Sequence, residues 1–281
     1  MTSLLQIYDC VTGAENTVYQ TDQLIEAPNW SRDGKFLVFN GEGRIYRLDL
    51  AEGEIPEEID TGFAVNCNND HGISPDGSTL VISDSTQEGA SCIYTLPVTG
   101  GEPRRITANT PSYWHGWSPD GSTLVYAGQR PYDGRPEGVF DIYAVPAGGG
   151  EEKRLTNGGF YNDGPDFTPD GEWLWFNSTR GGSMDLWRMR PDGSQMQQMT
   201  HDERVNWFPH PSPDGKRIVY LAYEEGVEGH PRDHDVELRL MDADGGNVRS
   251  VVSLFGGQGT VNVPSWSPDS RRFAFVRYRR P

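Results

Sequence analysis

Residues 116–126 read Gly-Trp-Ser-Pro-Asp-Gly-Ser-Thr-Leu-Val-Tyr, and variants of this stretch occur six times along the 281-residue chain. Each copy has a Ser or Thr two positions before an Asp, and an apolar run after it. The aspartates are spaced 43, 44, 50, 44 and 55 residues apart, at Asp33, Asp76, Asp120, Asp170, Asp214 and Asp269. A repeat of about 40–50 residues is typical of a propeller, in which each repeat forms a four-stranded blade.

Each repeat also predicts its own strands. Pro, Asp and Gly at successive positions predict a tight turn between two strands. The apolar run that follows, residues 124–126 in the third copy, predicts a strand buried on both faces. A third strand at residues 142–145, a Gly-rich hairpin and a short polar strand at residues 153–156 complete this repeat, and the polar strand suits an exposed edge.

The two ends of the chain predict how the ring closes. Only one strand, residues 273–276, follows the last turn, whereas residues 5–8 and 16–20 resemble a third and a fourth strand. We therefore predict an all-β, six-bladed propeller with four antiparallel strands per blade, in which N- and C-terminal strands share blade six. The predicted single domain, 1–281, comprises blades one to five at 24–61, 63–108, 110–157, 159–201 and 203–254, and blade six at 260–281 plus 1–21.

Composition narrows the range of partners. The formal net charge of -17 opposes binding to nucleic acid or to anionic membrane surfaces. No apolar run reaches 18 residues, which argues against a membrane span. Three cysteines are too few for a disulfide framework. The first ten residues lack the features of a signal peptide, so we expect a cytoplasmic monomer, or a periplasmic one had a leader been removed.

The repeat resembles that of the TolB-type six-bladed propellers. The resemblance rests on the Trp-Ser-Pro-Asp-Gly turn together with Asp141-Ile142-Tyr143, Gly148-Gly149 and Arg154-Leu155-Thr156, and it covers almost the whole chain. It implies a propeller whose channel engages a peptide of a protein partner. The α/β domain and the secretion signal of TolB are not found in this sequence. The same repeat precedes the catalytic domain of prolyl-oligopeptidase relatives, but no Gly-x-Ser-x-Gly motif supports such hydrolysis here.

The candidate site is the channel mouth on the face that carries the connections between blades. The long segments 129–138 and 223–235 are both predicted to be loops on that face, and function concentrates on such loops. One residue per blade, four positions before each turn motif, is predicted to line the mouth: Glu26, Asn69, Tyr113, Asp163, Trp207 and Asn262. Two positions before the motif, four blades carry a proline, which suits a strand at the edge of a channel. The other two blades carry His71 and His115.

Three interpretations of this ring remain open. In the first, the oxygens of Glu26, Asn69, Asp163 and Asn262 hold Ca²⁺, and residues 26–30 resemble a segment of the gluconolactonase family, whose members hold a divalent cation. In the second, His71 and His115, helped by Glu26, Asp70 or Asp163, hold a transition metal or perform acid–base catalysis, as in propeller lyases that act on uronic-acid oligosaccharides. In the third, the polar wall holds only ordered water.

Aromatic and carboxamide side chains near the mouth predict a binding site for a sugar or another small molecule. The candidates are Tyr113, Trp114, Tyr161, Asn162, Asn206, Trp207 and Phe208, and the alternative is that they pack the connecting loops. His201, His230 and His234 are expected to be solvated. The resulting hypothesis is a protein that binds a small molecule or saccharide, with metal-assisted lyase or hydrolase activity as its catalytic version. The alternative is a non-catalytic platform for a protein or peptide.

Overall fold

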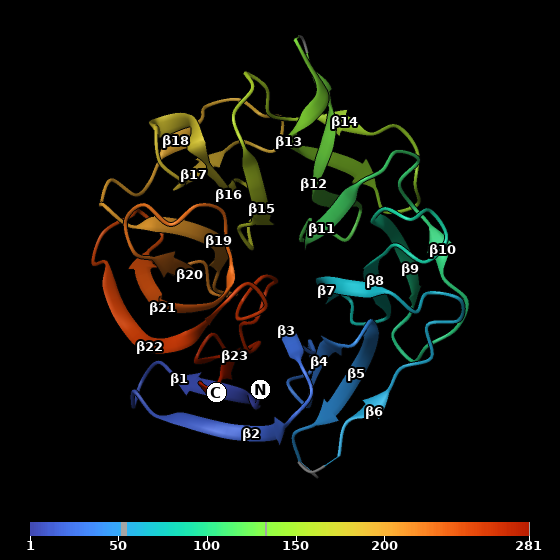
Figure 1. Cartoon of the computed structure of the whole chain (residues 1–281), viewed down its shortest axis with the longest axis vertical. Coiled ribbons are helices and arrows are strands. Elements are labelled where there is room, and N and C mark those ends of the chain that lie inside the picture. The colour runs from blue at the N-terminus through green and yellow to red at the C-terminus, as the bar shows by residue number, and fades with distance from the viewer. Residues whose placement is uncertain (52–54, 133, 281) are drawn as a thin grey trace.

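The computed structural model describes residues 1–51, 55–132 and 134–280. Residues 52–54, 133 and 281, which belong to predicted blades one, three and six, lie outside the described residues. Six antiparallel sheets are arranged around a common axis, and both termini lie in the same blade (Figure 1). The six-bladed all-β prediction is therefore confirmed. In the described residues the only helical segment is one 3-10 turn, η1 (Thr179–Gly181). This turn is far too short to span a bilayer as a helix.

Blades one to five each contain four strands paired in sequence order. Blades one and two comprise β3 (Ile25–Trp30), β4 (Phe36–Gly41), β5 (Arg44–Asp49), β6 (Glu57–Glu58), β7 (Cys67–Ile73), β8 (Thr79–Asp84), β9 (Cys92–Pro97) and β10 (Arg104–Arg105). Blades three and four comprise β11 (Ser112–Trp117), β12 (Thr123–Tyr132), β13 (Arg135–Pro146), β14 (Lys153–Arg154), β15 (Asn162–Phe167), β16 (Leu174–Ser178), β17 (Asp185–Met189) and β18 (Gln197–Gln198). Blade five comprises β19 (Val205–Pro211), β20 (Arg217–Tyr223), β21 (Arg232–Asp242) and β22 (Arg249–Gly257).

Blade six joins the two ends of the chain, as predicted. The strand β1 (Ser3–Asp9) lies between β2 (Glu15–Thr21) and β23 (Arg272–Tyr278), and its pairing with β23 is antiparallel from Ser3↔Tyr278 to Asp9↔Arg272. The innermost segment of this blade meets β23 through an isolated bridge between Trp266 and Phe273 and through a backbone hydrogen bond from the N–H of Val276 to the carbonyl oxygen of Thr260 at 3.1 Å. Closure of the ring therefore depends on the pairing of β1 with β23.

The two predicted long loops differ from one another. Segment 129–138 is not a loop, because β12 and β13 continue as a hairpin through the pairs Gln129↔Phe140 and Arg130↔Val139. Segment 223–235 does contain a connection, at residues 224–231, before β21 begins at Arg232. This connection carries His230, whose side chain lines the candidate site.

The repeated turn has the same hydrogen bonds in all six copies. In the third copy, Ser118 Oγ donates to Asp120 Oδ1 at 2.6 Å and accepts from the backbone N–H of Thr123 at 2.9 Å. Gly121 has a φ of 71°, which favours glycine over other residues. Asp120 also accepts hydrogen bonds from the backbone N–H and the hydroxyl of Ser122. The bonds from Ser118 and Ser122 together lower the pKa of Asp120 to about 2. The corresponding Ser or Thr bonds its Asp in the other copies, with distances between 2.5 and 2.9 Å.

We expect Ser118→Ala to lower the free energy of unfolding by about 1–3 kcal/mol, because it removes both bonds of a buried hydroxyl. Urea denaturation would measure the change. Ser253→Ala is the matched control, since Ser253 is exposed on β22 and should change little. Equal stability of the two variants would contradict a stabilising role for the turn.

Candidate functional site

The inner strands are bulged where they approach the site. In β3, β15 and β19 the pairing with the next strand shifts within the strand, between Glu26 and Asn29, Asp163 and Asp166, and Trp207 and His210. The first skipped residue in each has a φ of 54–60°, and the second is a proline, giving the pairs Ala27–Pro28, Gly164–Pro165 and Phe208–Pro209. Proline has no N–H to pair, so it fits the unpaired position of a bulge.

The two inner-strand histidines occupy this proline position but are placed differently. The pairing of β11 shifts between Trp114 and Gly116, so His115 lies in the bulge and lines a cavity. In β7 the shift ends earlier, and His71 pairs with Ile82 and is fully buried outside that cavity. Burial lowers the pKa of His71 to about 4. Of the two histidines, His115 therefore lines the cavity and His71 does not.

The cavity has a volume of about 330 Å³. Its walls come from the inner strands of blades two to five, from β13, from the β20–β21 connection and from the segment after β22. The lining residues are Asn68, Asn69, Asp70, Tyr113, His115, Phe140, Tyr161, Asp163, Phe208, His230, Gln258 and Asn262. The site thus combines carboxylates, carboxamides, imidazoles and aromatic rings.

A buried ion pair connects blades three and four inside the cavity. His115 Nε2 lies 3.0 Å from Asp163 Oδ1, and His115 Nδ1 lies 3.3 Å from the carbonyl oxygen of Asn262. A carbonyl can only accept, so Nδ1 carries a proton. Asp163 Oδ1 also accepts from the backbone N–H of Gly164 at 2.8 Å. Both ring nitrogens of His115 are therefore engaged by the protein.

The electrostatics of the pair favour its charged form. Burial lowers the pKa of His115, but the hydrogen bond and charge of Asp163 and the charge of Asp70 raise it above its ordinary value overall. Burial raises the pKa of Asp163, yet the hydrogen bond and charge of His115 bring it below its ordinary value. His115 is thus an imidazolium that neutralises Asp163.

Asp70 has no such counter-ion. Its side chain is buried, and among the described residues no hydrogen bond or ion pair reaches its carboxylate, although its backbone N–H donates to Asn68 Oδ1 at 3.0 Å. Burial, followed by the charges of Asp163 and Glu26, raises its pKa from 3.8 to about 7, against a lowering contribution from His115. Asp70 therefore gains or loses its charge close to neutral pH.

We expect Asp70→Asn to stabilise the protein at pH 8 by up to about 4 kcal/mol, because it removes a buried charge that the folded state disfavours. A carboxyl whose pKa is raised on folding costs stability above its ordinary pKa, so the gain should vanish as the pH falls from 7 towards 4. Urea denaturation at pH 4.5 and 8 would measure it.

Asp163→Asn is the matched comparison, and it should change the free energy of unfolding at pH 8 in the opposite direction. The pKa of Asp163 is lowered on folding, so its charge stabilises the fold at pH 8 and its removal should be destabilising. If both variants changed stability in the same direction at pH 8, the assigned electrostatics of the cavity would be wrong.

His230 is not a solvated loop residue, contrary to expectation. Its ring packs edge-on against Trp207, with centroids 4.4 Å apart, and against Phe208 at 5.3 Å, while Nε2 lies 3.9 Å from Asp163 Oδ2. Burial lowers its pKa, so the ring is neutral at pH 7. The sequence gives little sign of this, because His230 belongs to a connection outside the repeat.

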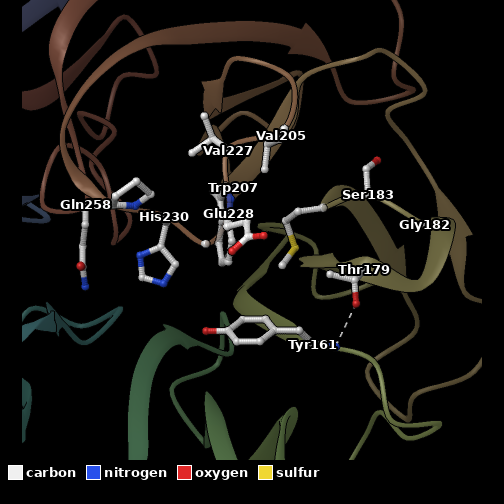
Figure 2. Close-up of a pocket in the computed structure, with 14 residues that line it drawn as sticks. Tyr161, Thr179, Gly182, Ser183, Val205, Trp207, Val227, Glu228, His230 and Gln258 are labelled. Atoms are coloured by element: carbon white, nitrogen blue, oxygen red, sulfur yellow. Dashed lines mark hydrogen bonds between the residues drawn. The ribbon is translucent and has the colours of Figure 1, made fainter.

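A larger groove of about 700 Å³ adjoins the cavity and shares Tyr161, His230 and Gln258 with it (Figure 2). Figure 2 shows Tyr161 and His230 facing a common space, with Trp207 behind them. Apolar side chains contribute much of the wall: Met184, Val205, Trp207 and Val227. The groove and the cavity together form one continuous surface.

The other predicted ligand residues divide between these walls and the interior. Tyr113, Tyr161 and Phe208 line the cavity, and Trp207 lines the groove. Asn162 and Asn206 are fully buried and hold the backbone, donating to the carbonyl oxygens of Phe160 and Arg204 respectively. Trp114 packs over Gly72, where an added Cβ would lie 2.2 Å from its ring. These last three residues do not reach the cavity.

Three of the four predicted metal ligands line the cavity. Asn69, Asp163 and Asn262 line the cavity, but Glu26 does not, and its Oε2 accepts from Asn40 at 3.3 Å. Asn262 Oδ1 already accepts from the backbone N–H of Gly259 at 2.7 Å. Within the described ranges, no three His, Cys, Asp or Glu side chains are grouped so that they could hold a metal ion. A bound Ca²⁺ or transition metal therefore stays a prediction, which elemental analysis of the purified protein tests.

Sequence reasoning also missed cavity-lining residues outside the inner strands and a second histidine–aspartate contact along the channel. Phe140 and Gln258 line the cavity although neither belongs to an inner strand. At the opposite end of the inner strands, a cavity of about 210 Å³ is lined by residues of the turn motifs, together with Arg32 and Asp166. There His210 Nδ1 lies 3.1 Å from Asp166 Oδ2 and His210 Nε2 lies 3.0 Å from the carbonyl oxygen of Val261.

The fold and the site define a TolB-like six-bladed propeller with a charged, aromatic-walled cavity at one end of its inner strands. A family model described as the TolB beta propeller domain matches residues 116–231. The protein Atu1656 of Agrobacterium fabrum is 54% identical over 278 residues, which cover 99% of this chain and 93% of that protein. A solved structure assigned as a TolB from Agrobacterium tumefaciens is 54% identical with a TM-score of 0.96, covering 100% of this chain and 99% of that one. This chain belongs to the TolB-type β-propeller family.

A relative with a functional name is more distant. The Tol-Pal system protein TolB of Francisella tularensis is 26% identical over 256 residues, covering 89% of this chain. The chain spans only 55% of the length of that TolB.

Two solved propellers share the fold alone. An oligogalacturonate lyase from Vibrio parahaemolyticus is 16% identical with a TM-score of 0.58, covering 90% of this chain and 74% of that one. A gluconolactonase from Xanthomonas campestris is 14% identical with a TM-score of 0.64, covering 98% of this chain and 92% of that one.

Proposed function

We propose that this protein binds a small polar molecule, such as a saccharide, in the cavity at the channel mouth. The observation that carries the proposal is a cavity of about 330 Å³ whose walls combine unengaged polar groups with aromatic rings. Small-molecule sites of about 300–1,000 Å³ typically have this composition. The repeats provide the rigid frame, and the connections between strands provide the specific walls.

The aromatic wall is continuous across blades three and four. The ring of Phe140 lies 5.9 Å from that of Tyr113 and 5.0 Å from that of Tyr161, centroid to centroid. On the other side, Phe208 stacks on His115 at 5.9 Å with an interplanar angle of 21°. Such rings offer apolar faces for stacking and, in the tyrosines, a hydroxyl for orientation.

Binding has more support than catalysis at this site. A general base must present a free lone pair to its substrate, and both ring nitrogens of His115 are engaged by Asp163 and Asn262. His71 is buried away from the cavity. Lyase or hydrolase chemistry that relies on His71 and His115 is therefore the weaker version of the proposal.

A thermal-shift screen of saccharides and small polar metabolites is expected to yield a compound that raises the melting temperature. Tyr113→Ala should weaken the binding of that compound about tenfold by calorimetry, because the loss of one stacking ring costs about 1.4 kcal/mol. Tyr19→Ala is the control, since Tyr19 lies on the outer strand β2. Unchanged affinity in Tyr113→Ala, or a screen without any binder, would count against the proposal.

A protein partner is the second candidate, and the groove favours it. Its volume of about 700 Å³ and its apolar side chains Met184, Val205 and Val227 suit a side chain or short segment of another protein. The relationship to TolB of the Tol-Pal system agrees with this candidate. In that case the propeller acts as a platform, and the cavity accepts only the end of the partner segment.

If the groove binds a protein, Val227→Glu should abolish recovery of that partner from an extract of the source cells, because it places a charge among apolar walls. Val11→Glu is the control, since Val11 is exposed outside the groove. Affinity purification followed by mass spectrometry would make the comparison. Recovery of the same partner with the wild type, Val227→Glu and Val11→Glu would exclude the groove as its docking site.

A further inference from the structure

We propose that the ligand carries a primary ammonium group that binds Asp70, together with an apolar substituent that occupies the adjoining groove. This inference rests on the proposed function, that the cavity binds a small molecule, and adds the chemical class of the ligand.

The first observation is the state of Asp70. The residue has 5% of its surface exposed and lines the cavity, and its carboxylate receives no hydrogen bond or ion pair from any described residue. A buried carboxylate without a partner is costly in free energy. Because Asp70 faces the cavity, a bound ligand is in a position to provide the missing partner.

The second observation is the balance of charge around the cavity. The groups that act on Asp70 electrostatically are His115, Asp163 and Glu26, and Asp70 in turn acts on Tyr113 and Tyr161. The charge of His115 is used by Asp163 at 3.0 Å, and His230 is kept neutral by burial. With Asp70 and Asp163 ionised and His115 protonated, the cavity lacks one positive charge.

The third observation is that the remaining walls suit a cation with several donors. The cavity is lined by the rings of Tyr113, Phe140 and Tyr161, and the electron-rich faces of aromatic rings attract ammonium groups. A primary ammonium has three N–H donors. Besides Asp70, the carboxamide oxygen of Asn69 and Asp163 Oδ2 are acceptors in the same cavity, the latter engaged only by long contacts of 3.4 and 3.9 Å.

The groove defines the rest of the ligand. It meets the cavity at Tyr161, His230 and Gln258 (Figure 2) and continues along Val205 and Val227. A molecule with its ammonium at Asp70 can therefore extend an apolar chain or ring into the groove. A free alkyl or arylalkyl amine and the N-terminus of a peptide with apolar first residues share this chemistry.

The test uses the full chain and calorimetry at pH 8 with 2-phenylethylamine, hexylamine and the dipeptide amide Leu-Phe-NH₂. Each has a neutral counterpart: 2-phenylethanol, hexanol and the N-acetylated dipeptide amide. We expect at least one amine to bind at least tenfold more tightly than its counterpart. A preference for the dipeptide would point to a peptide N-terminus, and a preference for the simple amines to a free amine.

Two variants separate Asp70 from the general negative charge of the protein. Asp70→Asn should weaken amine binding at least tenfold, whereas Asp22→Asn, which removes an equal charge from an exposed position, should leave it unchanged. The affinity of the wild type for the two simple amines, which stay protonated over this range, should fall as the pH decreases from 8 to 6, because Asp70, with a pKa of about 7, becomes protonated. Asp70→Asn should lose this pH dependence.

The outcomes distinguish this inference from the function on which it rests. Neutral compounds that bind as tightly as the amines, or full amine affinity in Asp70→Asn, would overturn the ammonium assignment. Binding of a saccharide without binding of any amine would overturn it while leaving the proposed function intact. If neither class bound, both would be rejected.

Discussion

Closure of the ring by β1 and β23 is the constraint on which the rest of the structure depends. Seven residue pairs, from Ser3↔Tyr278 to Asp9↔Arg272, join the two ends of the chain. The innermost segment of this blade adds the bridge between Trp266 and Phe273 and one backbone hydrogen bond from Val276 to Thr260. Asn262 lies in that segment and contacts His115 of blade three. The geometry of the site therefore depends on the pairing of the two chain ends, which are far from His115 in the sequence.

Within the closed ring, two local devices position the side chains. The Ser–Asp turn fixes one end of each inner strand through short hydrogen bonds, as in Ser118 and Asp120. The bulge near the other end places side chains such as Asp163 and His115 at the cavity. Rigid turns at one end and bulges at the other are a suitable frame for a site built from several blades.

The cavity contains carboxylates in two different states. Asp163 is neutralised by His115 and stabilises the fold, whereas Asp70 is buried without a counter-ion. An arrangement that costs stability when the site is empty is typical of functional sites, where the missing interaction comes from the ligand. This contrast, more than the number of polar residues, supports the proposed binding site over a channel wall that holds only ordered water.

The sequence by itself determined the number of blades, the shared closing blade and the inner-strand positions of Tyr113, His115 and Asp163, because these follow from the repeat period and strand alternation. It did not determine which inner-strand residues face the cavity. One shift in pairing separates His115 from His71, and such shifts depend on contacts between neighbouring strands. The placement of His230, Phe140 and Gln258, and the missing partner of Asp70, were decided only by the tertiary structure. These features arise from connections outside the repeat and from charges on different blades, which the local pattern of residues does not encode.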